Sequence, residues 1–308
     1  MNTHHSPARK LALLAATGAA VALGAAAIAW AAPVQIPDSY QILNLESVGD
    51  ARFDVTQPPD QYNDDCALGD LGGPVADDVG YSPATDVRSE GNDSDTFDGG
   101  LVLAIGRPGG APVVFEDSDQ FANKVGQQIT AGPETITGLR VTRTERALAT
   151  TPTLRSLIKL RNPKRKAQKR RVIWDSDLGA DGNEVVLASS TNDLVLTNAD
   201  RWMIFDEDPG SDPLGTFVLY GKGKGVKKTR VFNGVADADG CISFQTTVKV
   251  PKRSTRYLLF FTQVHDSDDG DGAVAAAKKF NRRKPAGVLA GLGKKVKRNV
   301  VNWKLTRR

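Results

Sequence analysis

The residues of this 308-residue chain that could do chemistry are mainly aspartates, because histidine and cysteine are scarce. Two of the three histidines, His4 and His5, precede an apolar N-terminal stretch, which leaves His265 alone in the rest of the chain. A zinc site built from several histidines is therefore excluded there, and a Ser-His-Asp triad would depend on His265. Because His265 follows an apolar run and precedes Asp266, we expect a strand-end histidine that hydrogen-bonds a neighbour.

The aspartates are gathered in short Asp/Gly clusters whose spacing suits calcium. The densest of these clusters contains Asp266, Asp268, Asp269 and Asp271. Calcium takes about six to eight oxygen ligands, and carboxylates this close together repel one another unless a cation neutralises them. No cluster matches an EF-hand loop, and Asx turns between strands use the same residues without a metal. Both interpretations stay open, with this acidic run as the first candidate for a calcium site.

Carboxylates also keep an enzymatic interpretation open. A glycoside hydrolase or polysaccharide lyase needs only a pair of carboxylates at a suitable separation, so an extracellular carbohydrate-active enzyme is the alternative function. No particular pair stands out in the sequence, and we assign no catalytic residue. The chain contains no nucleophile elbow, phosphate-binding glycine loop or dinucleotide fingerprint.

Basic residues form runs in the second half of the chain. Two of them, Lys164-Arg165-Lys166 and Lys169-Arg170-Arg171, lie between strand-like segments, and a third covers residues 222–230. We expect a hairpin loop at 164–171 whose cations hold an anionic glycan or cell-wall polymer by salt-sensitive attraction, without specific recognition of nucleic acid. The other interpretation is a solvated loop that prevents a strand edge from pairing.

Charge is segregated along the chain after the N-terminal stretch. Residues 32–138 contain four basic and 19 acidic residues, whereas residues 139–308 contain 34 basic and 17 acidic residues. Because strand-like runs interleave with the acidic residues, we expect two oppositely charged parts of one folded domain rather than a detached acidic tail.

The elements that must position these groups are predicted to be β-strands. The 30 glycines, 16 prolines and many aspartates favour turns, and short apolar or alternating runs recur between them. We predict a mainly β fold, a large antiparallel β-sandwich, with one or two short helices between about 273 and 303. Residues 58–98 read as a long loop or insertion. The predicted strands cover residues 40–45, 101–105, 113–115, 136–142, 154–160, 172–174, 184–188, 194–197, 202–205, 216–220, 242–250 and 256–264.

The N-terminal stretch predicts export. Arg9 and Lys10 precede the apolar residues 11–30, and Ala29-Trp30-Ala31 suits signal peptidase. We predict a general-export (Sec) signal peptide over residues 1–31, a secreted protein, and one β-sandwich domain over 32–308. An uncleaved N-terminal anchor is the alternative, and no second apolar run predicts a transmembrane domain in the mature chain.

Export would place the two cysteines, Cys66 and Cys241, in an oxidising compartment. We therefore predict one disulfide bond between them, with two unpaired buried thiols as the alternative. Trp174 and Trp202 fall inside predicted strands, which favours packing in the core over a platform for sugars.

Several short motifs occur between residues 99 and 303: Pro152-Thr153-Leu154-Arg155, Asn162-Pro163, Asp177-Leu178-Gly179-Ala180-Asp181-Gly182, Asp200-Arg201-Trp202 and Val301-Asn302-Trp303. Together they resemble the large secreted bacterial β-sandwich surface modules of the supersandwich type. The resemblance implies the fold and exposure outside the cell, and it carries over no functional residues. We expect a non-catalytic, secreted or cell-surface β-sandwich protein for adhesion or for glycan or cell-wall binding, stabilised by calcium.

Overall fold

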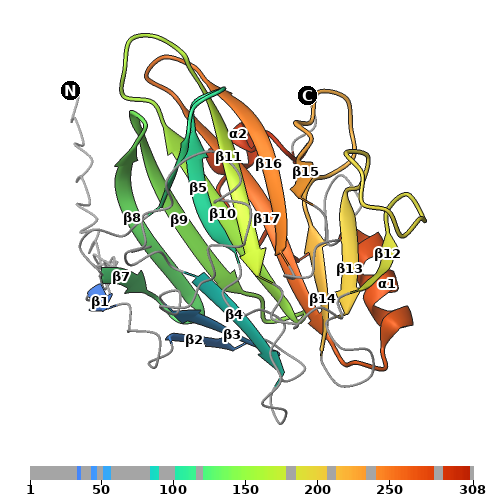
Figure 1. Ribbon diagram of the computed structural model, residues 1–308. Helices are drawn as coiled ribbons and strands as arrows, with labels where there is room; N and C mark the ends of the chain where they lie inside the picture. Colours follow the sequence, from blue (N-terminus) through green and yellow to red (C-terminus); the bar gives the residue numbers. More distant parts are fainter. Residues whose placement is uncertain are drawn as a thin grey trace, which may run out of the picture. The chain divides into compact units, whose positions relative to one another are not determined.

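Two large antiparallel sheets and one small one contain all the strands that the structure describes (Figure 1). The computed structural model describes residues 33–35, 43–46, 51–56, 84–89, 101–115, 121–177, 185–206, 213–233, 241–280 and 287–305. The predicted leader, Cys66 and most of the 58–98 tract lie outside these residues. All the described residues belong to one unit, Ala31–Arg308.

Strand order assigns each part of the chain to a sheet. The first sheet has nine strands in the order β1 (Pro33–Gln35), β7 (Phe121–Lys124), β8 (Gln128–Ile136), β9 (Leu139–Ala147), β10 (Thr153–Arg161), β17 (Thr255–His265), β14 (Leu214–Val218), β13 (Trp202–Asp206) and β12 (Val185–Ser189). The second sheet has five strands in the order β15 (Arg230–Asn233), β16 (Cys241–Val250), β11 (Gln168–Asp177), β5 (Val102–Gly106) and β6 (Pro112–Val114). The third sheet contains β2 (Leu43–Glu46), β3 (Ala51–Thr56) and β4 (Ala84–Ser89).

Alternating side chains of the first and second sheets pack face to face and form the main core. The Trp174 ring of β11 lies 5.4 Å from the Phe260 ring of β17, and Phe217 of β14 lies 5.0 Å from Phe244 of β16. The predicted antiparallel sandwich is therefore confirmed. Trp174 and Trp202 are both buried, as expected for core residues.

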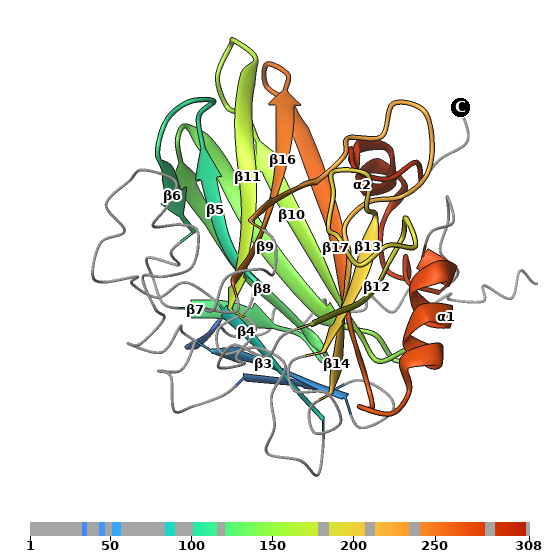
Figure 2. The ribbon, with the colours of Figure 1, turned by 45° about the vertical axis from the view of Figure 1, so that its right-hand side comes forward.

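The other face of the first sheet is covered by the C-terminal part of the chain (Figure 2). Helix α1 (Gly270–Phe280) places Phe280 4.9 Å from Phe261 of β17, and Trp303 lies 5.4 Å from the same ring. Helix α2 (Lys294–Asn299) is only six residues long, and Gly287 and Gly291 before it adopt positive φ angles that end any longer helix. In the described part of the chain, neither helix has the length and apolar character to cross a bilayer.

Some predicted strands were wrong in detail. The alternating residues 136–142 are divided by a tight turn at Thr137 and Gly138, both with positive φ, which joins β8 to β9. Residues 194–197 are not a strand: Leu194 and Val195 lie in a bend and are 65% and 69% exposed. Part of the predicted 58–98 loop is strand β4, which pairs with β3.

The predicted hairpin at 164–171 was also wrong. Strand β10 pairs with β9 and β17 in the first sheet, whereas β11 pairs with β16 and β5 in the second. The connection between β10 and β11 therefore crosses from one layer of the sandwich to the other. Lys169, Arg170 and Arg171 belong to β11 itself, because the alternating burial of this strand continues through them.

Candidate anion-binding surface

Two pockets lined by lysine and arginine adjoin each other on the described surface. The first, which we call the sheet groove, has a volume of about 950 Å³, and the second, the helix pocket, about 620 Å³. Val226 and Lys227 line both, so the two pockets share a boundary. The cations of the sheet groove are Lys169, Lys227, Lys228, Arg230 and Lys249. Those of the helix pocket are Lys224, Lys227, Arg256, Lys297, Arg298 and Lys304.

The sheet groove lies on the solvent face of the second sheet. On β16, Val248 and Val250 point into the core, so Thr247 and Lys249 between them point outward. Lys169 of β11 is directly opposite Lys249 in the antiparallel register. Like charges in that position destabilise a strand pair, and an anion bound between them would remove the cost.

Arg171 is the next outward residue of β11, and it is held by the edge of the sheet. Its Nε donates to the Arg107 carbonyl at 3.2 Å, and Nη2 donates to the Gly110 carbonyl. The guanidinium passes over Gly106 of β5, where a Cβ atom would lie 3.3 Å from Nη2. Arg171 therefore fixes the β5–β6 loop beside the groove.

The predicted anionic-ligand patch is divided by the fold. Lys169 reaches the sheet groove, but Arg170 points inward and is only 8% exposed. Its Nε donates to Thr137 Oγ1 at 2.9 Å, which ties β11 to the β8–β9 turn. Arg170 is therefore a structural residue, and its inclusion in the patch was wrong.

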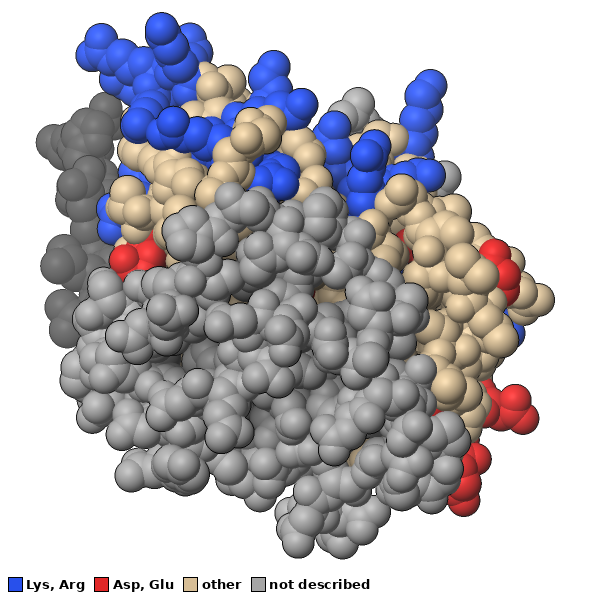
Figure 3. Space-filling model, in the orientation of Figure 1, with Lys and Arg blue, Asp and Glu red and all other residues tan. Residues whose placement is uncertain are grey.

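Lys164, Arg165 and Lys166 are exposed on the β10–β11 connection, as predicted. Asn162, which is fully buried, shapes this connection: its Nδ2 donates to the Lys166 carbonyl at 2.9 Å and to the Val250 carbonyl at 3.1 Å. The three cations therefore lie next to the end of β16 that carries Lys249. Figure 3 shows blue side chains gathered at this end of the visible face, with red side chains elsewhere on it.

The wall between the two pockets is the loop of residues 222–228, one of the basic runs of the sequence. The loop is anchored to the C-terminal segment, because Gly221 N donates to the Asn302 carbonyl at 3.0 Å and Lys227 N to the Val301 carbonyl at 2.8 Å. Just after the loop, the Thr229 hydroxyl lies 2.7 Å from the Thr246 hydroxyl of β16. Buried contacts thus hold a lysine-rich loop in one conformation.

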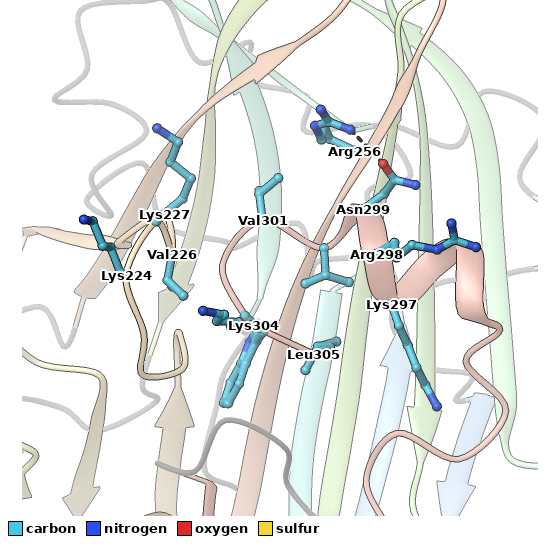
Figure 4. A pocket seen from close by; sticks show the side chains of 13 residues that line it. Lys224, Val226, Lys227, Arg256, Lys297, Arg298, Asn299, Val301, Lys304 and Leu305 are labelled. Atoms are coloured by element: carbon cyan, nitrogen blue, oxygen red, sulfur yellow. Dashed lines mark hydrogen bonds between the residues drawn. The ribbon is translucent and has the colours of Figure 1, made fainter. Parts of the chain in front are cut away.

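The C-terminal segment supplies the rest of the helix pocket (Figure 4). Arg256 Nη1 donates to Asn299 Oδ1 at 2.7 Å, which orients the guanidinium at the start of β17. Lys304 lies on the side of Lys224 and Lys227, whereas Lys297 and Arg298 point to the opposite side. Sequence reasoning missed these C-terminal cations as a site, because they are scattered in the sequence and only the fold brings them to the 222–228 loop.

Asn198 lines the sheet groove from the loop between β12 and β13. Asp200, which is fully buried, organises this loop: one carboxylate oxygen accepts from Thr191 Oγ1 at 2.6 Å and the other from Thr197 N at 2.9 Å. Burial by itself raises the pKa of Asp200, but the hydrogen bonds from Thr191 and Thr197 outweigh it and hold the pKa below its ordinary value. These bonds also explain why residues 194–197 are not a strand.

None of the described residues that line the two pockets carries a carboxylate. Among the described residues, Arg143 forms an ion pair with Glu145 at 2.6 Å and His265 with Asp269 at 3.9 Å, and neither pair includes a pocket cation. Six cations line one pocket and five line the other, and Lys227 is common to both. Ten positive charges therefore surround the two pockets, and no described lining residue is acidic.

The predicted calcium ligands lie where β17 leads into α1. Asp269 Oδ1 accepts a hydrogen bond from Gly272 N at 3.1 Å, and its carbonyl accepts from Ala273 N, so this residue caps the N-terminus of α1. Asp266, Asp268 and Asp271 are exposed. Within the described ranges, no three acidic, histidine or cysteine side chains are grouped as a metal site. Calcium binding at this run stays a prediction.

His265 ends β17, as expected, and lies close to Asp269. Burial lowers its pKa, and the opposing effect of Asp269 and Asp266 is smaller.

Cys241 begins β16, but Cys66 lies outside the described residues, so the disulfide bond also stays a prediction.

No protein-family model matches the chain, and no curated protein matches it. Solved structures that match part of the chain include the Slr1438 protein of Synechocystis sp. PCC 6803, with a TM-score of 0.43 and 11% identity over 75% of this chain and 98% of that one. A galactose mutarotase-like protein of Lactobacillus casei has a TM-score of 0.41 and 8% identity over 73% of this chain and 100% of the other. Heparan sulfate lyase HepC of Pedobacter heparinus has a TM-score of 0.39 and 8% identity, covering 70% of this chain and 33% of the lyase. These scores are too low to carry an argument about ligand or activity.

Proposed function

We propose that this chain is a non-catalytic, secreted or cell-surface β-sandwich protein that binds an anionic glycan or cell-wall polymer across the sheet groove and the helix pocket. The observation that carries the proposal is the set of ten cations around two adjoining pockets, with no acid among the described residues that line them. A polymer with regularly spaced anions matches an extended basic surface better than a small molecule does, because many weak contacts add along its length.

The positions of the cations also support binding of an anion. Lys169 and Lys249 repel each other across a strand pair, and the anchored 222–228 loop keeps Lys224 and Lys227 near Lys304. Each of these arrangements costs stability in the free protein. A bound polyanion would neutralise the repelling cations, and the relief of their repulsion would add to the binding free energy. Binding would also release the counterions condensed on the polyanion.

The alternative, a carbohydrate-active enzyme, needs a carboxylate pair in a groove. In the part of each pocket lining that the structure describes, no residue is Asp, Glu or His. The buried carboxylates of the described residues are Glu145, Asp175, Asp200 and Asp206, and none of them is among the residues that line the pockets. Glu145 accepts hydrogen bonds from Arg143 and Ser156, Asp175 accepts one from Ser243, and Asp200 accepts from Thr191 and Thr197. The geometry of the two pockets therefore favours binding without turnover.

The test is titration calorimetry with polygalacturonate and with neutral dextran. We expect polygalacturonate to bind and dextran not to bind. The affinity for polygalacturonate should fall steeply as salt is added, because the electrostatic screening length shortens to about 3 Å at 1 M ionic strength. The double variant Lys169→Gln/Lys249→Gln should bind about tenfold more weakly. Lys278→Gln/Lys279→Gln, which removes the same charge from the exposed end of α1, is the matched control and should bind normally.

Equal binding of both polymers, or equal losses in the two double variants, would reject the proposed surface. Release of shorter sugars from the polymer during the titration would instead establish the enzymatic alternative.

A further inference from the structure

We propose that the loop 222–228 is the shared wall of two subsites on one track, so that the protein binds the interior of an extended anionic chain and bridges both pockets with it. This inference rests on the proposed function and adds which part of the polymer is recognised. A protein that captures a chain end needs one closed pocket, whereas a track needs two open ones in line.

Two residues of the 222–228 loop face both pockets and so link them along the proposed track. Val226 and Lys227 line the sheet groove and the helix pocket alike. Val226 is half-buried against the main core, and Lys227 is tied to Val301 through its backbone. The wall is therefore an anchored boundary that carries its own cation, so positive charge continues from one pocket to the other.

The sheet groove is long enough to contact several repeating units. Lys169 on β11 and Arg230 on β15 are two strand spacings apart, about 10 Å, because β16 lies between them. Arg230 pairs with Gln245 and Lys169 with Lys249, an offset of about 13 Å along the strands. The groove therefore crosses the sheet diagonally over about 16 Å before it reaches Lys227.

The helix pocket continues this path. Figure 4 shows Lys224, Lys227 and Lys304 on the side of Val226, which is the side shared with the sheet groove. Arg256 lies further along, held by Asn299. A chain that follows the groove therefore meets further cations after the wall.

Two linked subsites make affinity depend on ligand length. Once one pocket holds part of a chain, the other pocket meets the next part at a high effective concentration, which raises the affinity without any new contact. Oligomers too short to cross the wall lack this gain.

The experiment uses oligogalacturonates of defined length, from the trisaccharide to the dodecasaccharide, with the whole protein and calorimetric titration. For the parent protein we expect affinity to rise with length and to gain about a hundredfold or more once both pockets are bridged. Lys169→Gln/Lys249→Gln should impair the sheet groove, and Lys224→Gln/Lys304→Gln the helix pocket. In either variant the increase in affinity from the trisaccharide to the dodecasaccharide should be smaller by about tenfold or more, while the trisaccharide still binds to the unchanged pocket.

The outcomes separate the two proposals. If no oligomer binds the parent, the proposed function fails. If oligomers bind with the same affinity at every length, or if only one of the two variants reduces the gain, the protein binds anionic glycan at a single pocket and the track is rejected. Lys278→Gln/Lys279→Gln should keep the full dependence on length, and circular dichroism confirms that each variant is folded.

Discussion

Burial decides the protonation of His265 more than its acidic neighbours do. Desolvation lowers the pKa, whereas Asp269, 3.9 Å from Nδ1, and Asp266 raise it by less. The folded state therefore holds a proton on this imidazole less readily than the unfolded state, whose pKa is about 6.5. Between the two pKa values the unfolded chain binds more protons, so the free energy of unfolding falls as the pH drops below about 6.5.

His265→Asn should remove this part of the pH dependence. We expect the parent protein to lose stability between about pH 6.5 and pH 5, above the range in which exposed carboxylates titrate, and the variant to lose less. Urea unfolding across this pH range measures the effect. Parallel pH profiles for the two proteins would show that His265 is protonated equally in the folded and unfolded states.

At the scale of elements, side-chain alternation predicted the long strands but not how they pair. Residues 242–250 and 256–264 were identified within one or two residues of β16 and β17, because each carries many β-branched or aromatic side chains. Alternation continued unbroken through Thr137 and Gly138, where a turn reverses the chain, since a two-residue turn does not interrupt an alternating pattern.

The C-terminal segment is an element whose position depends on one buried amide. Asn302, fully buried, donates from Nδ2 to the carbonyls of Leu219 at 2.9 Å and Leu259 at 2.7 Å, and its Oδ1 accepts from Leu259 N. Trp303 adds a bond from Nε1 to the Leu259 carbonyl. The segment that carries Lys304 is thus fastened to β17 and to the end of β14.

Asn302→Ala should lower the free energy of unfolding by about 2–4 kcal/mol, because it leaves buried backbone groups unsatisfied. It should also weaken binding of long oligogalacturonates by displacing Lys304. Urea unfolding and calorimetry measure the two effects, with the exposed Lys295→Ala as the control, for which a change within about 0.5 kcal/mol is expected. A variant as stable as the parent would mean that Asn302 does not fasten the segment.

At the scale of the whole molecule, the charge distribution is the property on which the proposed function rests. The second half of the sequence is strongly basic, and the fold gathers ten of its cations around two pockets. The export signal, the Cys66–Cys241 bond and the calcium site concern the whole molecule as well, and they stay predictions.

The calcium prediction is tested by thermal melting in millimolar calcium and in chelator. A site at the acidic run should raise the melting temperature in calcium, because binding to the native state alone stabilises it, and Asp268→Asn/Asp271→Asn should abolish the rise. Equal melting temperatures in the two conditions would remove the calcium site. Asp269 already has another role, because its hydrogen bonds cap the N-terminus of α1.

By itself, the sequence determined that this chain folds mainly as antiparallel strands, that Trp174 and Trp202 pack inside, and that its basic residues concentrate after residue 138. Composition and two-residue alternation are local properties, so they can be seen in the sequence alone. Only the tertiary structure decided which of those cations act together. Arg170 points inward because side chains alternate between the two faces of β11 and Arg170 falls on the buried face. Arg256 and Lys304 line the same pocket as Lys227 although they are distant from it in the sequence. The reason is that a binding surface depends on strand pairing and chain crossing, which bring residues together through long-range contacts that no local pattern encodes.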